Sequence, residues 1–277
     1  PSHQVVVSNT PVLEESVSGD IKTVQFEKTK PMPTYLIAYT VGPFDSTEMT
    51  GLSVPGRIYV PKGHIDKTKF VIKHTPEILT SLEDFFGIKY PYKKMDFVAV
   101  PNFTHGAMEN VGLITYRDSL LLLADNPSVT ERSGPLNVIA HELAHQWFGN
   151  LVTMAWWDDL WLNEAFASWA ASHTMKTLYP ELNYADRLVQ EGAFGADASP
   201  TVKPVKKVVK RQPDVMDGLG LNYSKGESIL QMIESLIGTD SFREGVRNYM
   251  KTHSWGNTVA DDLWRALDGV SNFNLSA

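Results

Sequence analysis

The stretch from His141 to Glu164 constrains the fold of this chain more than any other, because it places three potential metal ligands at a defined spacing. It opens with His-Glu-x-x-His and closes with Asn-Glu, with eighteen residues between the second histidine and the last glutamate. In a helix, His141 and His145 stand on one face about one turn apart, so both imidazoles can reach one ion. Glu164 supplies a third ligand if one helix ends at Gly149-Asn150 and another begins near Trp161. Two His and one Glu leave a coordination position open, as in catalytic zinc sites.

Glu142 is the predicted general base of this site. It projects roughly 100° further round the helix than the first histidine, near the ion but not toward it. A carboxylate at that place can hold water rather than bind the metal. The alternative is that His-Glu-x-x-His arose by chance on a surface helix, which we expect about once in a hundred chains of this length. The correctly placed Glu164 makes that alternative rarer still.

Other residues nearby are weaker candidates for a role at the metal site. Asp159 and Asn163 are candidates to orient the ligand imidazoles by accepting an N–H. His105 is expected to be a solvated loop residue, and His173, about 2.5 helical turns beyond Glu164, is expected to face away from the metal. The tryptophans between residues 156 and 161 are expected to pack under the site.

A second group of residues lies upstream, at Gly106-Ala107-Met108-Glu109-Asn110. Together with His-Glu-x-x-His and the later glutamate, it resembles the aminopeptidase N family of zinc metallopeptidases, the gluzincin aminopeptidases. The similarity continues through Trp156-Trp157, residues 160–164 and Tyr223-Ser224-Lys225-Gly226. The resemblance implies a zinc metallo-aminopeptidase, a hydrolase that removes N-terminal residues from peptides by metal-activated water and uses one Zn²⁺ per chain.

The resemblance also implies roles for residues outside the metal ligands. Tyr223 would donate a hydrogen bond to the oxyanion of the tetrahedral intermediate, since a phenol is uncharged at neutral pH. Glu109 would pair with the cationic α-amino group, so that only the first peptide bond lies over the metal. Gly106, Ala107 and Met108 would let main-chain groups approach the peptide, and Asn110 completes this substrate-binding set.

Three other functions remain compatible with the sequence. One is a binding or regulatory module that keeps zinc without turnover, although Glu142 and Tyr223 are both present. Another is epoxide hydrolysis on the same site, an activity that one branch of the family adds. The third is a thermolysin-type endopeptidase, which Glu109 speaks against.

Composition limits the partners. The chain has 277 residues, no cysteine and a net charge of −7, which argue against disulfides, thiol catalysis and nucleic acid or anionic membrane as main partner. No apolar run approaches the length of a membrane span, and the N-terminus does not resemble a signal peptide. We therefore expect a cytoplasmic protein; the oligomeric state is not indicated. The family resemblance implies that its substrates are peptides with a free N-terminus.

The expected fold is α+β, with a thermolysin-like catalytic domain at residues 73–277 preceded by the C-terminal part of a β-rich domain at residues 1–72. Family members normally carry more sequence before this point, so we expect an excised piece or the product of a shortened gene. The predicted strands are residues 3–7, 23–26, 35–41 and 57–60, then 94–100 and 111–116 as a hairpin-like pair.

Helices are predicted from apolar periodicity and from their start and stop signals. The first starts at Thr75-Pro76 and stops before Gly87, and the metal-binding helix starts at Ser133-Gly134-Pro135. The remaining predicted helices are residues 160–179, 224–237, 240–253 and 258–268. Residues 192–213 are expected to be irregular, with the basic run at Lys203, Lys206, Lys207, Lys210 and Arg211 as a solvated loop.

Overall fold

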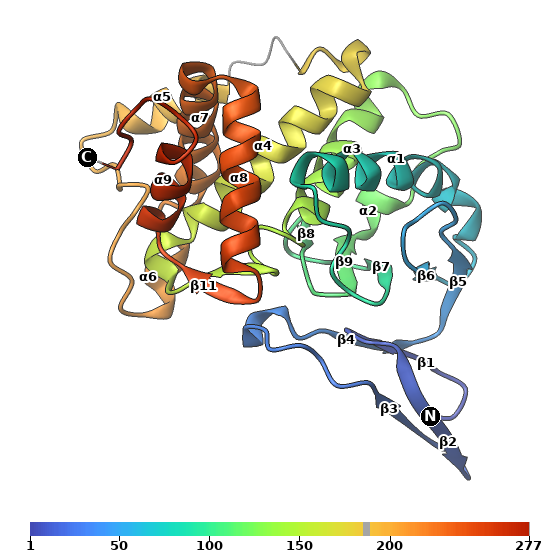
Figure 1. The fold of residues 1–277 in the computed structure, drawn as a ribbon. Coiled ribbons are helices and arrows are strands. Elements are labelled where there is room, and N and C mark those ends of the chain that lie inside the picture. The colour runs from blue at the N-terminus through green and yellow to red at the C-terminus, as the bar shows by residue number, and fades with distance from the viewer. Residues whose placement is uncertain (185–188, 277) are drawn as a thin grey trace. The chain divides into compact units, whose positions relative to one another are not determined.

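The computed structural model describes residues 1–184 and 189–276. The chain folds into two compact units, the first made of residues 1–81 and 89–142 and the second of residues 82–88 and 143 onward. Two helices, α1 and α3, begin in the first unit and end in the second. Helices and strands both contribute substantially, in agreement with the predicted mixture of α and β structure (Figure 1).

The elements of the first unit come mostly from the first half of the chain. Its strands are β1 (Val5–Ser8), β2 (Val12–Ser18), β3 (Ile21–Phe26), β4 (Tyr39–Gly42), β5 (Phe44–Glu48), β6 (Gly56–Pro61), β7 (Met95–Val100), β8 (Ala107–Met108) and β9 (Leu113–Arg117). Its helices are α1 (Lys69–Phe86), α2 (Asp118–Leu121), α3 (Val129–Ala144) and the short 3-10 helices η1 (Thr34–Leu36) and η2 (Ile65–Thr68).

The second unit is mainly helical. Its helices are α4 (Trp161–Leu178), α5 (Val189–Asp197), α6 (Gln212–Met216), α7 (Leu219–Ile237), α8 (Thr239–His253), α9 (Ala260–Asp268) and the 3-10 helices η3 (Trp157–Asp159) and η4 (Pro180–Leu182). The strands β10 (Val152–Met154) and β11 (Gly256–Thr258) form a short parallel pair.

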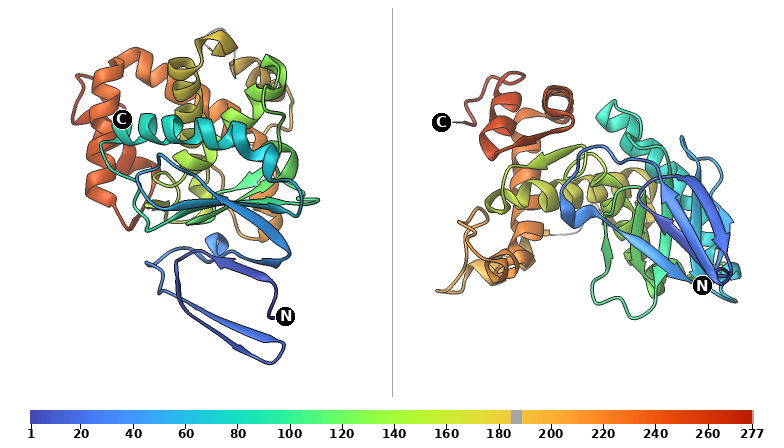
Figure 2. Two further views of the ribbon diagram at one scale, coloured as in Figure 1. Left: turned by 90° about the vertical axis from the view of Figure 1, so that its right-hand side faces the viewer. Right: turned by 90° about the horizontal axis from the view of Figure 1, so that it is seen from below.

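A five-stranded sheet in the order β5-β6-β7-β9-β8 organises the first unit. Strands β6, β7 and β9 are parallel, and the outer strands β5 and β8 run antiparallel to their neighbours. Helix α1 lies over one face of this sheet, and the ladders β1–β4 and β2–β3 lie on its other side (Figure 2). Val7 of β1 packs there against Val98 and Leu113, which gives the N-terminal segment an apolar contact with the sheet.

Asn9 forms hydrogen bonds that connect the end of β1 with the turn before β9. Its side-chain amide donates hydrogen bonds to the carbonyls of Leu36 (2.9 Å) and Val111 (2.8 Å), and its Oδ1 accepts from the N–H of Ala38 (3.0 Å). Gly112 has φ +65°, and a Cβ there would lie 2.1 Å from the Asn9 carbonyl oxygen. Since Asn9 is buried, these bonds fix the backbone directly after Asn110.

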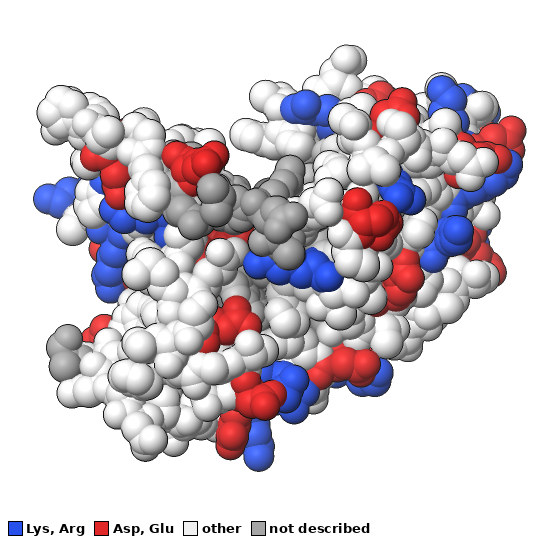
Figure 3. Space-filling model, turned by 90° about the horizontal axis from the view of Figure 1, so that it is seen from above, with Lys and Arg blue, Asp and Glu red and all other residues white. Residues whose placement is uncertain are grey.

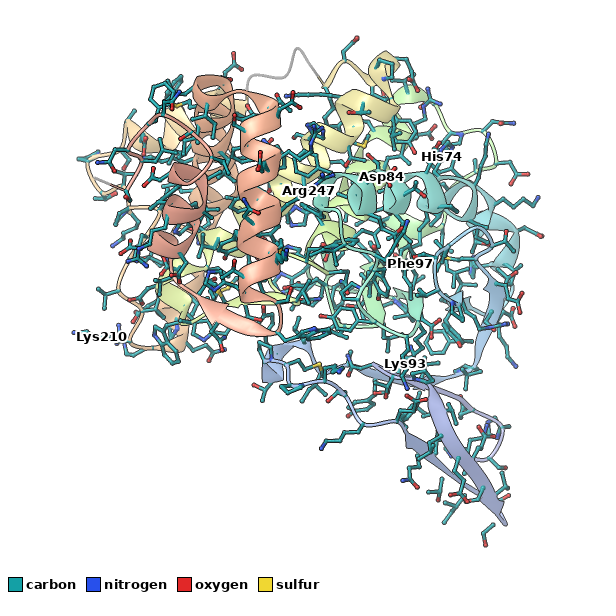
Figure 4. All side chains as sticks on the ribbon, in the orientation of Figure 1. His74, Asp84, Lys93, Phe97, Lys210 and Arg247 are labelled. Carbon is teal, nitrogen blue, oxygen red and sulfur yellow. The ribbon has the colours of Figure 1, made fainter. Side chains whose placement is uncertain are left out.

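The core of the second unit is aromatic and helical. Phe148 and Phe166 stack with ring centroids 3.9 Å apart, and Trp169 packs on Phe242 at 4.9 Å. Arg247 of α8 donates to the last carbonyls of α1, those of Asp84 and Phe85, and so satisfies acceptors that a helix end leaves open. Figure 4 shows Arg247 and Asp84 side by side.

The start of the metal-binding helix differs from the prediction. Helix α3 begins at Val129 rather than at Ser133, because Ser128 and Glu131 form a capping box. The N–H of Glu131 donates to Ser128 Oγ (3.3 Å), and the N–H of Ser128 donates to Glu131 Oε2 (2.8 Å). Pro135 consequently lies inside the helix rather than at its start.

Other helices and strands also differ from the prediction in their boundaries or pairing. Helix α1 begins at Lys69 and contains Pro76, so residues 69–72 are helical rather than part of the β-rich segment. Strands β7 and β9 are parallel neighbours and not a hairpin, because the intervening chain loops out and returns through β8. Within residues 192–213, α5 and α6 replace part of the expected irregular segment, and α7 begins at Leu219, earlier than residue 224.

The exposed surface mixes charges of both signs. Acidic and basic side chains are interspersed over the face drawn in Figure 3. Among the described residues, no helix has the length and apolar character needed to span a bilayer.

The contact between α4 and α7 yields a stability prediction. A Cβ at Gly226 would lie 2.5 Å from Cβ of Ala165, so Gly226→Ala forces the two helices apart and should lower the free energy of unfolding by about 1–3 kcal/mol. Gly220, also in α7, has nothing within 4 Å of its hypothetical Cβ, so Gly220→Ala should be neutral or stabilising. Urea unfolding of both variants measures the difference; equal effects would contradict the close packing.

Candidate metal centre

His145 lies in the turn that ends α3 and is held by a main-chain group. Its Nδ1 is 3.0 Å from the carbonyl oxygen of Phe148, and because a carbonyl only accepts, Nδ1 carries the proton. Nε2 is therefore the nitrogen that can bind a metal. Gly149, with φ +119°, turns the chain here, and a Cβ at this position would lie 3.1 Å from Nδ2 of Asn163 and 3.4 Å from Nδ1 of His145. A side chain at position 149 would therefore crowd the imidazole of His145, and glycine avoids this.

Glu164, the third potential ligand, lies in the first turn of α4. This helix begins at Trp161, as the sequence predicted, and Glu164 Oε2 lies 3.4 Å from His145 Nε2. His141 lies in the last turn of α3, four residues before His145. One potential ligand atom from each of His141, His145 and Glu164 lies within 4.8 Å of the others.

The donor set fits a zinc ion. Nε2 of His145 and the Glu164 carboxylate oxygen both offer lone pairs, so at 3.4 Å they need a positive charge between them. A proton on the imidazole would suffice for this pair alone, but the convergence of His141 favours a metal ion. Two imidazoles and one carboxylate are a common ligand set of catalytic zinc.

Glu142 is buried in the first unit, with 6% of its surface exposed, one residue after His141. Tyr116 of β9 is buried close enough to feel its charge. Burial raises the pKa of the Tyr116 phenol well above its ordinary value, and the negative charge of Glu142 raises it further. Tyr116 therefore remains a neutral phenol beside the carboxylate at neutral pH.

The loop from Gly106 to Asn110 forms the edge of the five-stranded sheet. Ala107 and Met108 make up β8, which pairs with Tyr116 and Thr115 of β9. Gly106 accepts a hydrogen bond from the N–H of Arg117 at 2.8 Å. These bonds hold one edge of β8, and its other edge is the outer edge of the sheet.

The polar end of this loop is buried. Glu109 and Asn110 are 6% and 5% exposed. The hydroxyl of Thr115 donates to Asn110 Oδ1 (3.0 Å), and the N–H of Leu113 donates to the Asn110 carbonyl (3.1 Å). These bonds constrain the backbone directly after Glu109.

Tyr223 is half-buried near the start of α7. Gly226, three residues further along the same face of this helix, packs on Ala165, which directly follows Glu164. The packing of α7 on α4 thus brings the turn with Tyr223 close to the turn with Glu164.

Several other predictions about single residues can be compared with the structure. His105 is exposed and His173 packs on Trp169 (5.3 Å between ring centroids), and neither belongs to the metal-binding group. Burial lowers the pKa of His173. Trp161 is buried as expected, but Trp156 is 58% exposed, because its indole N–H instead reaches the carbonyl of Val209 (2.9 Å).

Sequence reasoning missed three contributors to the site. The main-chain carbonyl of Phe148 orients His145, a role that was predicted from the sequence for Asp159 or Asn163. A main-chain acceptor cannot be recognised from the type of residue that carries it. Asp159 instead accepts from Trp161 and Lys206. Tyr116 looked like an ordinary aromatic strand residue, and Asn9 lies about a hundred residues away from the loop it holds, so no local pattern could have revealed them.

The fold and the site thus define a chain with a candidate His–His–Glu metal centre next to a buried glutamate. Comparison with known families identifies it further: residues 70–277 match the "Peptidase family M1 domain". The chain belongs to peptidase family M1.

Similar proteins include several aminopeptidases. Identity is 37% over 98% of this chain with "Aminopeptidase M1" of Arabidopsis thaliana and 41% over 96% with "Aminopeptidase 2" of Candida albicans. It is 37% over 98% with "Leucyl aminopeptidase" of Saccharolobus solfataricus. The chain spans 31%, 30% and 35% of these three relatives, respectively.

The ligand assignment predicts metal binding independently of activity. We expect the protein to bind one zinc per chain and to gain about 2.7 kcal/mol of stability at a hundredfold excess of zinc over the dissociation constant. Single changes of His141, His145 or Glu164 to Ala should remove stoichiometric zinc, whereas His105→Ala should not. Elemental analysis after dialysis and thermal unfolding with and without zinc provide the measurements. Full zinc content in a ligand variant would show that the residue is not a ligand.

Proposed function

We propose that this chain carries the catalytic site of a zinc-dependent aminopeptidase, which hydrolyses the N-terminal bond of peptides. The observation that carries the proposal is the convergence of His141, His145 and Glu164 within 4.8 Å, next to a buried glutamate, in a chain of peptidase family M1. The similar proteins named as aminopeptidases support the exopeptidase class. The fold that accompanies this function is a thermolysin-like catalytic domain at residues 73–277 preceded by part of a β-rich domain.

Zinc held by His141, His145 and Glu164 would act as a Lewis acid that acidifies water and polarises the substrate carbonyl. Glu142 would take the proton from the attacking water and deliver it to the leaving amine. Its burial beside a neutral phenol limits competing solvation and keeps the carboxylate in place. Tyr223 would donate a hydrogen bond to the oxyanion that develops on the substrate.

Substrate orientation would come from the loop before β9. An extended peptide can add to the outer edge of β8, where Ala107 and Met108 present main-chain groups, with Gly106 leaving space. Met108 would face the first side chain, and Asn110 would fix the loop through its bond to Thr115. Glu109 would pair with the α-amino group, so the chain would accept peptides with a free N-terminus.

A pair of chromogenic substrates tests the function. Zinc-loaded protein should cleave Ala- and Leu-anilide but not their N-acetylated twins. Glu109→Gln should lower kcat/KM for the free-amine substrates about 10- to 100-fold, the range expected when a charge-assisted contact is lost. Glu14→Gln, on exposed β2, serves as the control.

The other outcomes discriminate the alternatives. Cleavage of both forms would indicate an endopeptidase, and cleavage of neither by a zinc-loaded chain would indicate a zinc-binding module without turnover. An unchanged kcat/KM in Glu109→Gln would contradict the amine-anchor assignment.

The role of Glu142 gives a separate prediction. Glu142→Gln keeps the size and burial of the side chain but cannot accept the proton from water, so kcat should fall at least about a hundredfold. Zinc content should stay at the wild-type level, since Glu142 is not among the ligands. Steady-state kinetics together with metal analysis decide this point: wild-type turnover in the zinc-loaded variant would refute the general-base role.

A further inference from the structure

The basic run after α5 is not a free loop. We name residues 203–210 the basic strap. Exposure alternates along its second half: Val205, Lys207 and Val209 are less exposed than Lys206 and Val208. The Lys206 side chain stays 53% exposed although its Nζ reaches Asp159. Val209 is only 5% exposed. An extended segment with this alternation lies against the protein on one side, so the structure gives the strap defined contacts.

One end of the strap is hydrogen-bonded to the residues that lead into α4. The N–H of Val209 donates to Asp158 Oδ1 at 2.6 Å. The carbonyl of the same residue accepts from the indole N–H of Trp156 at 2.9 Å. The main chain of Val209 is thus bonded in both directions to side chains that precede Trp161, the first residue of α4.

Lys206 forms an ion pair with Asp159. Its Nζ lies 3.1 Å from Asp159 Oδ2, and the Asp159 side chain is 5% exposed. Asp159 Oδ1 in turn accepts from the indole N–H of Trp161 at 3.3 Å. A buried carboxylate needs a countercharge, so Lys206 stabilises the carboxylate of Asp159. That carboxylate is hydrogen-bonded to Trp161 in the first turn of α4. Glu164 is in that turn.

The other end of the strap touches the start of α7. Lys203 pairs with Asp217 at 3.4 Å, and a Cβ at Gly218 would lie 3.0 Å from Cβ of Lys203. Gly218 immediately precedes α7, which carries Tyr223. The strap therefore connects the starts of the two helices that present Glu164 and Tyr223.

We propose that Lys206 is a positioning residue for Glu164, acting through Asp159 and Trp161 on the first turn of α4. This inference rests on the proposed role of Glu164 as a metal ligand. Removing the charge of Lys206 leaves the buried carboxylate uncompensated, so the first turn of α4 loosens and the ligand is less well placed. Changes in residues that support ligands commonly weaken metal binding by about 10- to 100-fold.

The experiment compares three variants of the whole chain. Lys206→Met keeps the aliphatic stem without the charge, Lys206→Arg restores the charge, and Lys210→Met removes a lysine of the same strap that points outward at the edge of the second unit (Figure 4). Zinc affinity is measured by chelator competition. Amide hydrogen exchange of residues 156–166 is followed in metal-free protein, and kcat and KM are measured on Leu-anilide.

We expect Lys206→Met to bind zinc at least about tenfold more weakly and to lose exchange protection in the first turn of α4. Its kcat should fall while KM changes little, because Glu109 is untouched. Lys206→Arg should behave as wild type, and Lys210→Met should differ from it in none of these measurements. A double-mutant cycle with Asp159→Asn should show that the two effects are not additive.

Two results would overturn the inference: wild-type zinc affinity and exchange in Lys206→Met, or equal losses in Lys206→Met and Lys210→Met. Failure of the proposed function looks different. If the wild-type chain binds no zinc or hydrolyses no anilide, the metal or peptidase assignment fails, whereas exchange protection in metal-free protein still decides whether Lys206 orders the start of α4.

Discussion

Two groups that both offer lone pairs, Nε2 of His145 and a carboxylate oxygen of Glu164, face each other at 3.4 Å. Such a pair is repulsive unless a cation lies between them. His141 adds a third potential ligand atom within 4.8 Å, and several contacts elsewhere in the structure hold the segments that carry these groups. The carbonyl of Phe148 fixes the tautomer of His145, and Gly149 turns the chain closely enough to allow it.

The supporting contacts range from the packing of whole helices to single hydrogen bonds. At the level of helices, Gly226 lets α7 lie against α4 next to Ala165. At the level of single polar groups, Asp159 joins Trp161 to the basic strap. In the first unit, Asn9 ties the backbone after Asn110 to the N-terminal strands, so that the loop of residues 106–110 is held from outside its own sheet. Each of these contacts joins residues that are far apart in the sequence.

Local signals predicted the elements well where they were unambiguous. The start of α4 at Trp161 is confirmed, whereas α3 ends at Ala144 and not at Gly149-Asn150 as predicted. Gly149, with φ +119°, turns the chain five residues after the helix has ended. The start of α3 was placed at Ser133-Gly134-Pro135, although the stronger signal was Ser128 followed three residues later by Glu131. Pro76 was taken as a helix start, but α1 begins seven residues before it. In α1 the buried residues Phe70 and Val71 favour the earlier start, and in α3 the Ser128–Glu131 capping box does so.

The sequence by itself determined the candidate site residues and the family resemblance. The spacing of two histidines and a glutamate dictates a shared helical face and a third ligand, and the motifs around Glu109 and Tyr223 supplied the family resemblance. Only the tertiary structure decided how those groups are held. The partner of His145, the parallel pairing of β7 and β9, the exposure of Trp156 and the anchoring of the basic strap all depend on contacts between distant segments. Local sequence periodicity specifies faces and turns, whereas the choice among distant partners is made by the packing of the whole chain.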